Sequence, residues 1–177
     1  MPCSVNISSY QLSDCFSSRG GIKAVWVANY VENGFTVSTG GTVTGFSGVT
    51  WYKQELRRNT GSMTSTLNVN DDNGVSYVST EAVIIYSKMQ KEERMQMNAL
   101  TKGDFMMVVQ DSNDNYFALG MEEPVKASAG TGETGTGRDD RNAYSITLTD
   151  YNSEWPALLD DTAIAQLGGN TQTAIQQ

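Results

Sequence analysis

Val83-Ile84-Ile85-Tyr86 begins the stretch of sequence that decides the fold, which runs from Val83 to Leu148. A charged, methionine-rich segment follows as Lys88-Met89-Gln90-Lys91-Glu92-Glu93-Arg94-Met95-Gln96-Met97-Asn98-Ala99-Leu100, and it holds strong helix formers without glycine or proline. Two short apolar runs then flank the turn sequence Asp111-Ser112-Asn113-Asp114-Asn115. The stretch therefore predicts a strand, a helix over about residues 88–101, a hairpin and a closing strand from Tyr144 to Thr149.

Alternating residues extend the β pattern toward the N-terminus. Residues 22–31 are largely apolar on both sides of the alternation, with Ile22 and Ala24 on the same side, which is typical of a strand covered on both faces. Asn33-Gly34 predicts a tight turn that needs positive φ, so we expect Phe35-Thr36-Val37-Ser38 to pair back on that strand. A second hairpin is predicted from Met63 to Tyr86.

These elements predict one β-rich domain over residues 1–177. We expect mainly β structure, in an antiparallel β-barrel or β-sandwich with one flanking α-helix and long exposed loops. Residues 128–142 are too rich in glycine and charge to bury themselves and predict a flexible Gly-rich loop. Residues 168–177, which begin with two glycines, predict a mobile C-terminal tail.

Composition and charge disfavour stable nucleic-acid binding and a place in a membrane. The chain has 20 acidic and 12 basic residues and a net charge of -8, whereas binding to phosphates needs clustered bases. No run approaches the roughly 18 apolar residues of a membrane span, and no signal peptide is visible, so we expect synthesis in a cytoplasm. The spacing of Cys3 and Cys15 leaves a disulfide open but matches no metal motif, and two reduced thiols fit this compartment better.

Two motifs invite a chemical interpretation, and each fits an ordinary turn or loop better. The oxygen ligands of an EF-hand calcium loop are imitated by Asp111, Asn113, Asn115 and Glu122. Tyr116, however, stands where that loop needs glycine, and the flanking segments are strand-like. The run from Gly132 to Arg138 imitates a phosphate-binding loop, but Arg138 replaces the lysine and no helix is expected to follow. We therefore predict no metal and no cofactor.

Paired acids are the remaining candidates for catalysis. Such pairs occur at Asp71-Asp72, Asp139-Asp140 and Asp160-Asp161, and all three are expected in solvated turns or loops. The chain has no histidine, which removes the commonest general base and every His-dependent nucleophile. We therefore predict that the protein is not an enzyme and has no catalytic residue.

Aromatic residues suggest a different class of function. A sugar-binding platform is one interpretation of Trp26, Trp51, Tyr52, Tyr116, Phe117 and Trp155. Rings at strand positions are more often buried by packing, which favours a role in the core. A carbohydrate-binding or receptor-binding β-sandwich nevertheless stays open as the alternative function.

Four segments together resemble a known group of proteins. They are Cys15 followed by Gly20-Gly21-Ile22-Lys23-Ala24-Val25-Trp26, the helix 88–100 with Lys102-Gly103-Asp104, the hairpin 111–120, and the closing segment from Gly135 to Leu148. Across most of the chain the sequence resembles small structural proteins of tailed phages and prophages of Bacteroidetes hosts, crAss-like phages included. The resemblance implies a virion component of the tail or neck, with a β-barrel or β-sandwich, one helix and loops that reach neighbouring subunits.

The resemblance also implies partners and a location. We expect a homo-oligomeric ring or tube, hexameric in a tail or dodecameric in the neck, that contacts neighbouring tail or portal-complex proteins. DNA would be only transient cargo passing through an acidic lumen, and the protein would reside in the virion after synthesis in the host cytoplasm. We predict subunit contacts at Gly130, Gly132, Gly135, Gly137, Arg138, Arg141 and Trp155.

Overall fold

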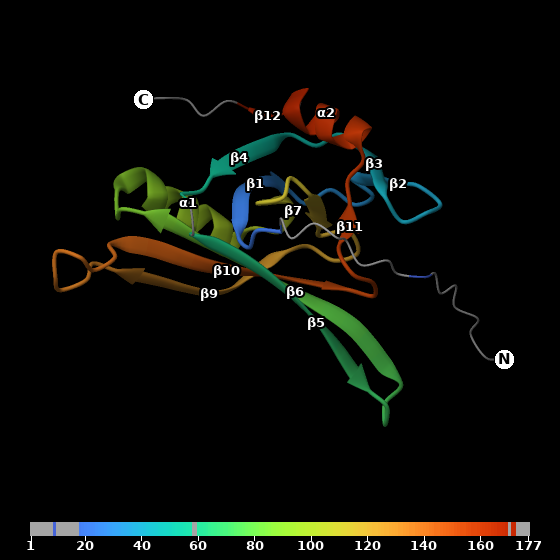
Figure 1. The fold of residues 1–177 in the computed structure, drawn as a ribbon, viewed down its shortest axis with the longest axis horizontal. Coiled ribbons are helices and arrows are strands. Elements are labelled where there is room, and N and C mark those ends of the chain that lie inside the picture. Colours follow the sequence, from blue (N-terminus) through green and yellow to red (C-terminus); the bar gives the residue numbers. More distant parts are fainter. Residues whose placement is uncertain (1–8, 10–17, 58–59, 170, 173–177) are drawn as a thin grey trace.

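The computed structural model describes residues 9, 18–57, 60–169 and 171–172, and they form a mainly β structure with two helices. Its two larger sheets pack face to face, and both are open rather than closed in this part of the chain (Figure 1). Of the two predicted architectures, the β-sandwich with a flanking helix is therefore confirmed. Cys3 and Cys15 lie outside the described residues.

The larger sheet has six strands in the order β11-β8-β7-β1-β4-β12. Its central pair, β1 and β7, is antiparallel, and its two outermost strands are only two residues long. The strands are β1 (Ile22–Asn29), β4 (Trp51–Glu55), β7 (Phe105–Asp111), β8 (Tyr116–Leu119), β11 (Ala157–Leu158) and β12 (Thr171–Gln172). The predicted hairpin around Asp111–Asn115 is the pair β7–β8.

The smaller sheet has four antiparallel strands in the order β5-β6-β10-β9. Its strands are β5 (Gly61–Asn70), β6 (Val75–Ser87), β9 (Lys126–Glu133) and β10 (Ala143–Asn152). The pair β5–β6 confirms the second predicted hairpin, and β10 confirms the predicted closing strand. A separate two-stranded ribbon is formed by β2 (Phe35–Val37) and β3 (Val43–Phe46).

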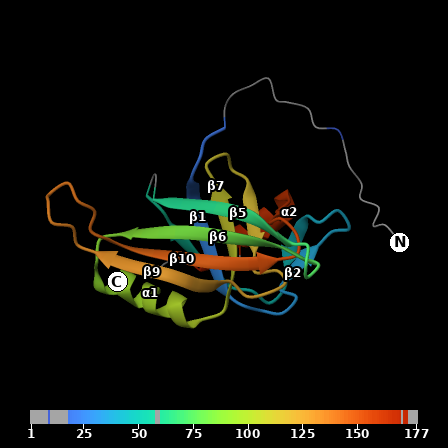
Figure 2. The same cartoon turned by 90° about the horizontal axis from the view of Figure 1, so that it is seen from below.

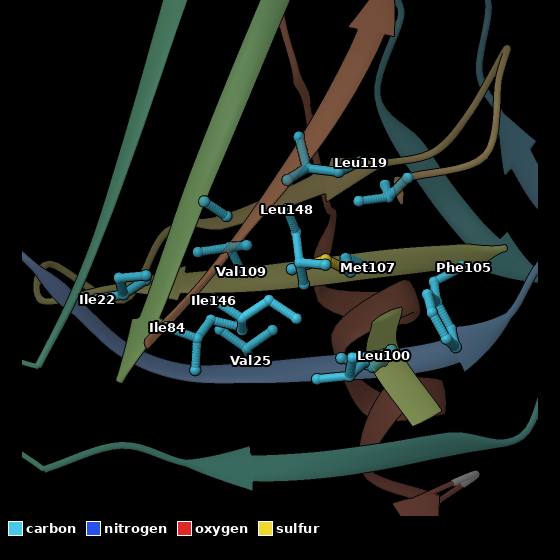
Figure 3. Close-up of a cluster of buried hydrophobic side chains, with 13 residues drawn as sticks. Ile22, Val25, Ile84, Leu100, Phe105, Met107, Val109, Leu119, Ile146 and Leu148 are labelled. Carbon is cyan, nitrogen blue, oxygen red and sulfur yellow. The ribbon is translucent and has the colours of Figure 1, made fainter. Parts of the chain in front are cut away.

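The main hydrophobic core lies between the two larger sheets (Figure 3). Val25 of β1 and Met107 of β7 face Ile84 of β6 and Leu148 of β10, and all four side chains are fully buried or nearly so. Burying one such side chain stabilises the fold by about 1.5–3 kcal/mol. Strict alternation along β6 and β10 sends Ala82, Ile84, Ile146 and Leu148 into this core, and the residues between them face the other way.

A second core covers the opposite face of the six-stranded sheet. Helix α2 (Asp161–Gly169) and the β2–β3 ribbon pack there against Trp51 and Val108. Strands β1 and β7 are consequently buried on both faces, and for β1 this confirms the prediction from the largely apolar pattern of residues 22–31. A β-bulge between Ile22 and Ala24 moves Ile22 to the side of Val25, so the prediction that Ile22 and Ala24 share a face is wrong.

Helix α1 (Lys91–Lys102) confirms the predicted helix and lies over β9 and β10. Leu100 of this helix is buried in the core, and Met97 packs against the core from the same side of the helix. Gly103 follows the last helical residue as predicted, but its φ of -101° is ordinary. Glycine is needed there because a Cβ would collide with the ring of Phe105.

The predicted pairing after the Asn33-Gly34 turn is wrong. The chain does turn here and Asn33 adopts a positive φ of 56°, but Gly34 does not, so the expected turn with positive φ at both residues is not formed. Phe35 pairs with Phe46 of β3 rather than with β1, whose two edges are taken by β4 and β7. Ring contacts of Phe35 and Phe46 with each other and with Trp51 stabilise this ribbon, and those contacts depend on residues distant in sequence.

Two segments that were expected to lack structure contain regular elements. The predicted loop 128–142 begins as part of strand β9, and the excursion from the sheet covers only residues 134–142. The predicted tail 168–177 begins inside α2, and Thr171–Gln172 pairs in parallel with Trp51–Tyr52. Asp160 caps the unpredicted helix by accepting a hydrogen bond from the Ala163 amide at 2.8 Å. Residues 173–177 lie outside the described residues.

Glycine at position 132 allows the side chains of Tyr144 and Met89 to pack closely on β9. A Cβ there would lie 2.9 Å from Cε1 of Tyr144 and 3.2 Å from Cε of Met89. Gly132→Val is therefore expected to lower the free energy of unfolding by about 1–3 kcal/mol, because both side chains must move. Urea denaturation of dilute protein measures the loss. Thr131→Val, at an exposed neighbouring position, is the control, and an equal loss in both variants would contradict this packing role.

Candidate functional site

Within the described parts of the chain, the four-stranded sheet has two long edge strands that pair with no further strand. β5 is one edge strand and has ten residues, and β9 is the other and has eight. Both outermost strands of the six-stranded sheet have only two residues. Short outermost strands are a common way to keep a sheet from pairing with another chain, so the two sheets differ in how their edges are protected.

β5 has no other protection, whereas β9 has a lysine at one end and a bulge. β5 contains neither proline nor a charged residue. β9 carries charges only at its two ends, where Lys126 lies 3.4 Å from Asp104 and Glu133 pairs with Arg141. Monomeric proteins usually place lysine, proline or a bulge on such strands. The register shift between Thr147 and Leu148 is the only irregularity between β9 and β10, and the pairing of β5 with β6 has none.

The outward face of the four-stranded sheet carries many small hydroxyl side chains, together with Tyr77, Val83, Ile85 and Tyr151. None of the elements that the structure describes packs on this face, which is turned to the viewer in Figure 2. The hydroxyl side chains here are Ser62, Thr64, Thr66, Ser79, Thr131, Ser145, Thr147 and Thr149. Glu81 adds a charge in the middle of the face, which carries no base there.

The β5–β6 hairpin projects beyond the rest of its sheet as a two-stranded arm. β10 ends at Asn152 opposite Val78, so residues 68–77 of the hairpin, beyond the pair Leu67 and Val78, have no third strand beside them (Figure 1). We call residues 67–78 the arm. Its exposed large apolar side chains are Leu67 (49%), Val69 (58%), Val75 (47%) and Tyr77 (39%). An arm of this composition is typical of a surface that contacts another protein.

The turn between β9 and β10 is ordered by one carboxylate. Oδ2 of Asp140 accepts hydrogen bonds from the amides of Thr136 at 2.7 Å and Gly137 at 2.6 Å, and these bonds lower the pKa of Asp140. Gly135 stands at the turn with a φ of 68°, which favours glycine. Asp140 therefore occupies the backbone amides that a bound phosphate would need, and the comparison with a phosphate-binding loop does not hold.

The predicted contact residues do not form one cluster. Gly130 and Gly132 lie in the edge strand β9, where Gly130 lies near Met97 of α1 and Gly132 near Met89, whereas Gly135 and Gly137 belong to the turn. Arg141 pairs with Glu133 across the base of that turn, and Arg138 is exposed near its tip. Trp155 is 60% exposed and lies between β10 and β11. Their role in subunit contacts stays a prediction.

The calcium-like motif forms a tight turn instead of a cation site. Oδ1 of Asp111 accepts hydrogen bonds from the amides of Asn113 and Asn115, both at 2.8 Å. Burial acts to raise the pKa of Asp111, but its bonds to these two residues outweigh burial and lower that pKa. Glu122 points elsewhere and binds Ser153. Within the described residues, no three Asp, Glu, Cys or His side chains lie where they could hold a metal ion.

The paired acids and the aromatic residues also lie apart. Asp71-Asp72 stands at the tip of the arm, Asp139-Asp140 in the β9–β10 turn and Asp160-Asp161 at the start of α2. Trp26 and Trp51 are buried, which confirms the expected core role for these two rings. Trp51 contacts Phe35 and Phe46, and Trp26 contacts Tyr116, so these two tryptophans form no open platform. Tyr52 and Trp155 are exposed but lie on separate parts of the fold. The positions of the paired acids and of the aromatic rings do not favour the sugar-binding alternative.

A buried carboxyl group on β10 escaped the sequence analysis. Asp150 is 1% exposed, and burial raises its pKa to about 7. Its Oδ2 accepts a hydrogen bond from Nδ2 of Asn152 at 2.5 Å, and backbone amides of Gly120 and Tyr151 lower the pKa only in part. The charges of Glu122 and Glu123 raise it further. The alternation Ile146, Leu148, Asp150, Asn152 already places this pair on the inward face, and that is the signal by which it could have been found.

Comparison with known proteins places the chain in no family. No family model matches it, and no curated protein matches it. The fold defines a broad class, the mainly antiparallel β-sandwich with flanking helices. A similar solved structure is a chain of the "Virion of native gene transfer agent (GTA) particle", with a TM-score of 0.38, 6% identity, and coverage of 60% of this chain and 88% of that chain. None of the helices within the described residues is long and apolar enough to span a membrane.

Proposed function

We propose that this protein is a non-enzymatic structural subunit of a phage virion that assembles with copies of itself into a ring or tube. The observation that carries the proposal is the contrast between its sheets. One sheet has outermost strands of two residues, whereas the other leaves strands of ten and eight residues open without prolines or central charges. Such edges favour pairing with another chain, and the resemblance of the sequence to small phage virion proteins gives this pairing a setting.

In this proposal, β5 of one copy pairs with β9 of the next. The two edges lie on opposite sides of one sheet, so this pairing is head to tail and closes into a ring when the rotation per copy divides a full turn. Gly130 and Gly132 would then lie where the two copies pair, which agrees with the prediction that both are subunit contacts. Six or twelve copies are expected from the resemblance, with neighbouring tail or portal-complex proteins above and below.

The outward sheet face is the surface that we assign to the lumen. Small hydroxyl groups and Glu81 offer DNA no base to hold it, and the net charge of -8 adds to this. DNA would therefore pass as transient cargo through the tail or neck. The exposed turn 134–142 is expected to contact a neighbouring copy through Arg138.

Edge pairing is tested by charging β5 without disturbing the core. Thr64→Lys/Thr66→Lys places two bases on an exposed edge, so the variant is expected to stay folded and monomeric while the wild type forms rings. Light scattering and negative-stain microscopy over a range of concentration and salt measure assembly. Thr147→Lys, on the same face of the interior strand β10, is the control and is expected to assemble.

Two outcomes count against the proposal. If the wild-type protein stays monomeric at every concentration and salt, self-assembly is wrong. If the double-lysine variant forms the same rings as the wild type, assembly does not use the β5 edge.

A further inference from the structure

Helix α1 presents a basic surface to solvent. With 100° between successive residues, Leu100 lies on the inward side, and the outward side is formed by Lys91, Arg94, Met95, Asn98 and Lys102. We call these five residues the basic face of α1. Met95 is 58% exposed at its centre, and the three bases form no salt bridge within the described parts of the chain. In a protein with a net charge of -8, this is an unusual concentration of unpaired bases.

The arm has the complementary character. Asp71 and Asp72 stand at its tip, and no lysine or arginine occurs from Gly61 to Ser87. Val69 and Val75 flank the acids and are about half exposed. The tip of the arm therefore complements the basic face of α1. Its two acids match the three bases, and its apolar neighbours match the exposed methionine.

The turn at the arm's tip does not need its acidic side chains. The amide of Asn73 donates to Oδ1 of Asn70 at 3.2 Å, and the amide of Gly74 donates to the backbone carbonyl of Asp71 at 3.4 Å. Gly74 supplies the positive φ of 63° that closes the turn. The two carboxylates are consequently free to contact a partner.

The two surfaces cannot meet within one copy. β6 runs the length of the sheet from the arm to the segment before α1, so the arm's tip and α1 lie at opposite ends of the sheet, as both views show (Figures 1 and 2). A contact between them therefore joins two copies head to tail along the strands. Edge pairing, in contrast, joins copies across the strands.

We propose that the arm of one copy docks on the basic face of α1 of a second copy, with Asp71 and Asp72 against Lys91 and Arg94, and that this contact stacks rings into a tube. The inference rests on the proposed ring but uses different residues and a different direction. Because all of the charges are exposed, the contact weakens as salt rises, and its apolar part remains.

Charge reversal on each side, alone and combined, tests the contact. Asp71→Lys/Asp72→Lys and Lys91→Glu/Arg94→Glu are each expected to leave single rings and to remove stacks. The four substitutions together are expected to restore stacks, because the charges again complement each other. Sedimentation velocity and counts of stacked particles in negative stain measure this. Lys91→Glu places an acid in the first turn of α1, which favours the helix and guards against unfolding.

Glu32→Lys/Glu123→Lys is the matched control, since it changes the net charge by the same amount at exposed sites outside the arm and outside the proposed contacts, and its stacks are expected to persist. Wild-type protein that forms rings but never stacks would overturn the docking inference and leave the ring intact. Stacks that survive either reversal, or a combined variant that recovers none, would overturn it too. Loss of binding to a polyanion in Lys91→Glu/Arg94→Glu without loss of stacks would assign the basic face to an anionic partner instead. Absence of rings in the wild type would contradict the proposed function itself.

Discussion

Asp150→Asn is expected to stabilise the protein at pH 8 by on the order of 3 kcal/mol, and this gain is expected to shrink almost to zero at pH 4. The carboxyl group of Asp150 has a pKa of about 7 in the folded protein, against 3.8 for an ordinary aspartate. Between these values the folded state holds a proton that the unfolded state has released. Wild-type stability therefore falls as the pH rises from about 4 to 7 and is constant above, whereas the asparagine variant lacks this loss.

Urea denaturation followed by tryptophan fluorescence between pH 4 and pH 8, at a concentration that keeps the protein monomeric, measures the difference. Asparagine keeps an oxygen that accepts from Asn152 and removes only the charge that burial penalises. Asp139→Asn is the control, because it changes an exposed residue of the β9–β10 turn and is expected to alter stability little. A gain of equal size at pH 4 and pH 8 would show that the buried charge is not its cause.

Trp51→Ala is expected to lower the free energy of unfolding by about 3–5 kcal/mol, enough to unfold a marginally stable domain. Trp51 is fully buried in the second core, and the rings of Phe35 and Phe46 pack around it with centroid distances of 6.2 and 5.0 Å. Its Nε1 is buried without a hydrogen-bond partner within the described residues, so the loss comes from packing and not from a broken bond.

Trp155→Ala provides the comparison, because the same substitution removes a ring that is 60% exposed. Its effect on the free energy of unfolding is expected to stay within about 0.5 kcal/mol. Thermal and urea denaturation of both variants measure the contrast. A similar loss at the two positions would mean that Trp155 also packs on the body of the protein.

Local sequence signals predicted elements well where the chain supplies both strands of a pair nearby. The hairpins β5–β6 and β7–β8 and the helix α1 follow from alternation, turn residues and helix formers that act over short distances. The strand after the Asn33 turn was assigned the wrong partner, because pairing with β3 depends on ring contacts to Trp51. Turn chemistry fixes a reversal of the chain but not the strand that it meets.

Strand β9 and helix α2 show a different limit. Glycine lowers the intrinsic preference for a strand, so the segment around Gly130 and Gly132 reads as a loop, whereas Tyr144 and Met89 cover it in the structure. Only four of the nine residues of α2 are apolar, and its stability comes from burying Ala163 and Leu167 on the sheet. The open edges likewise could not be read from sequence, because the order of strands in a sheet decides which strands end up outermost.

The pairing of β12 with β4 has a consequence for synthesis of the protein. Strand β4 ends at Glu55, and the residues that cover its outer edge, Thr171–Gln172, are made more than a hundred residues later. Until those residues leave the ribosome, β4 is an unpaired edge strand of the nascent chain, in addition to the edge strands β5 and β9. Folding of the larger sheet is therefore completed late, and a chaperone that covers the edge of β4 before that point would raise the yield of correctly folded subunits.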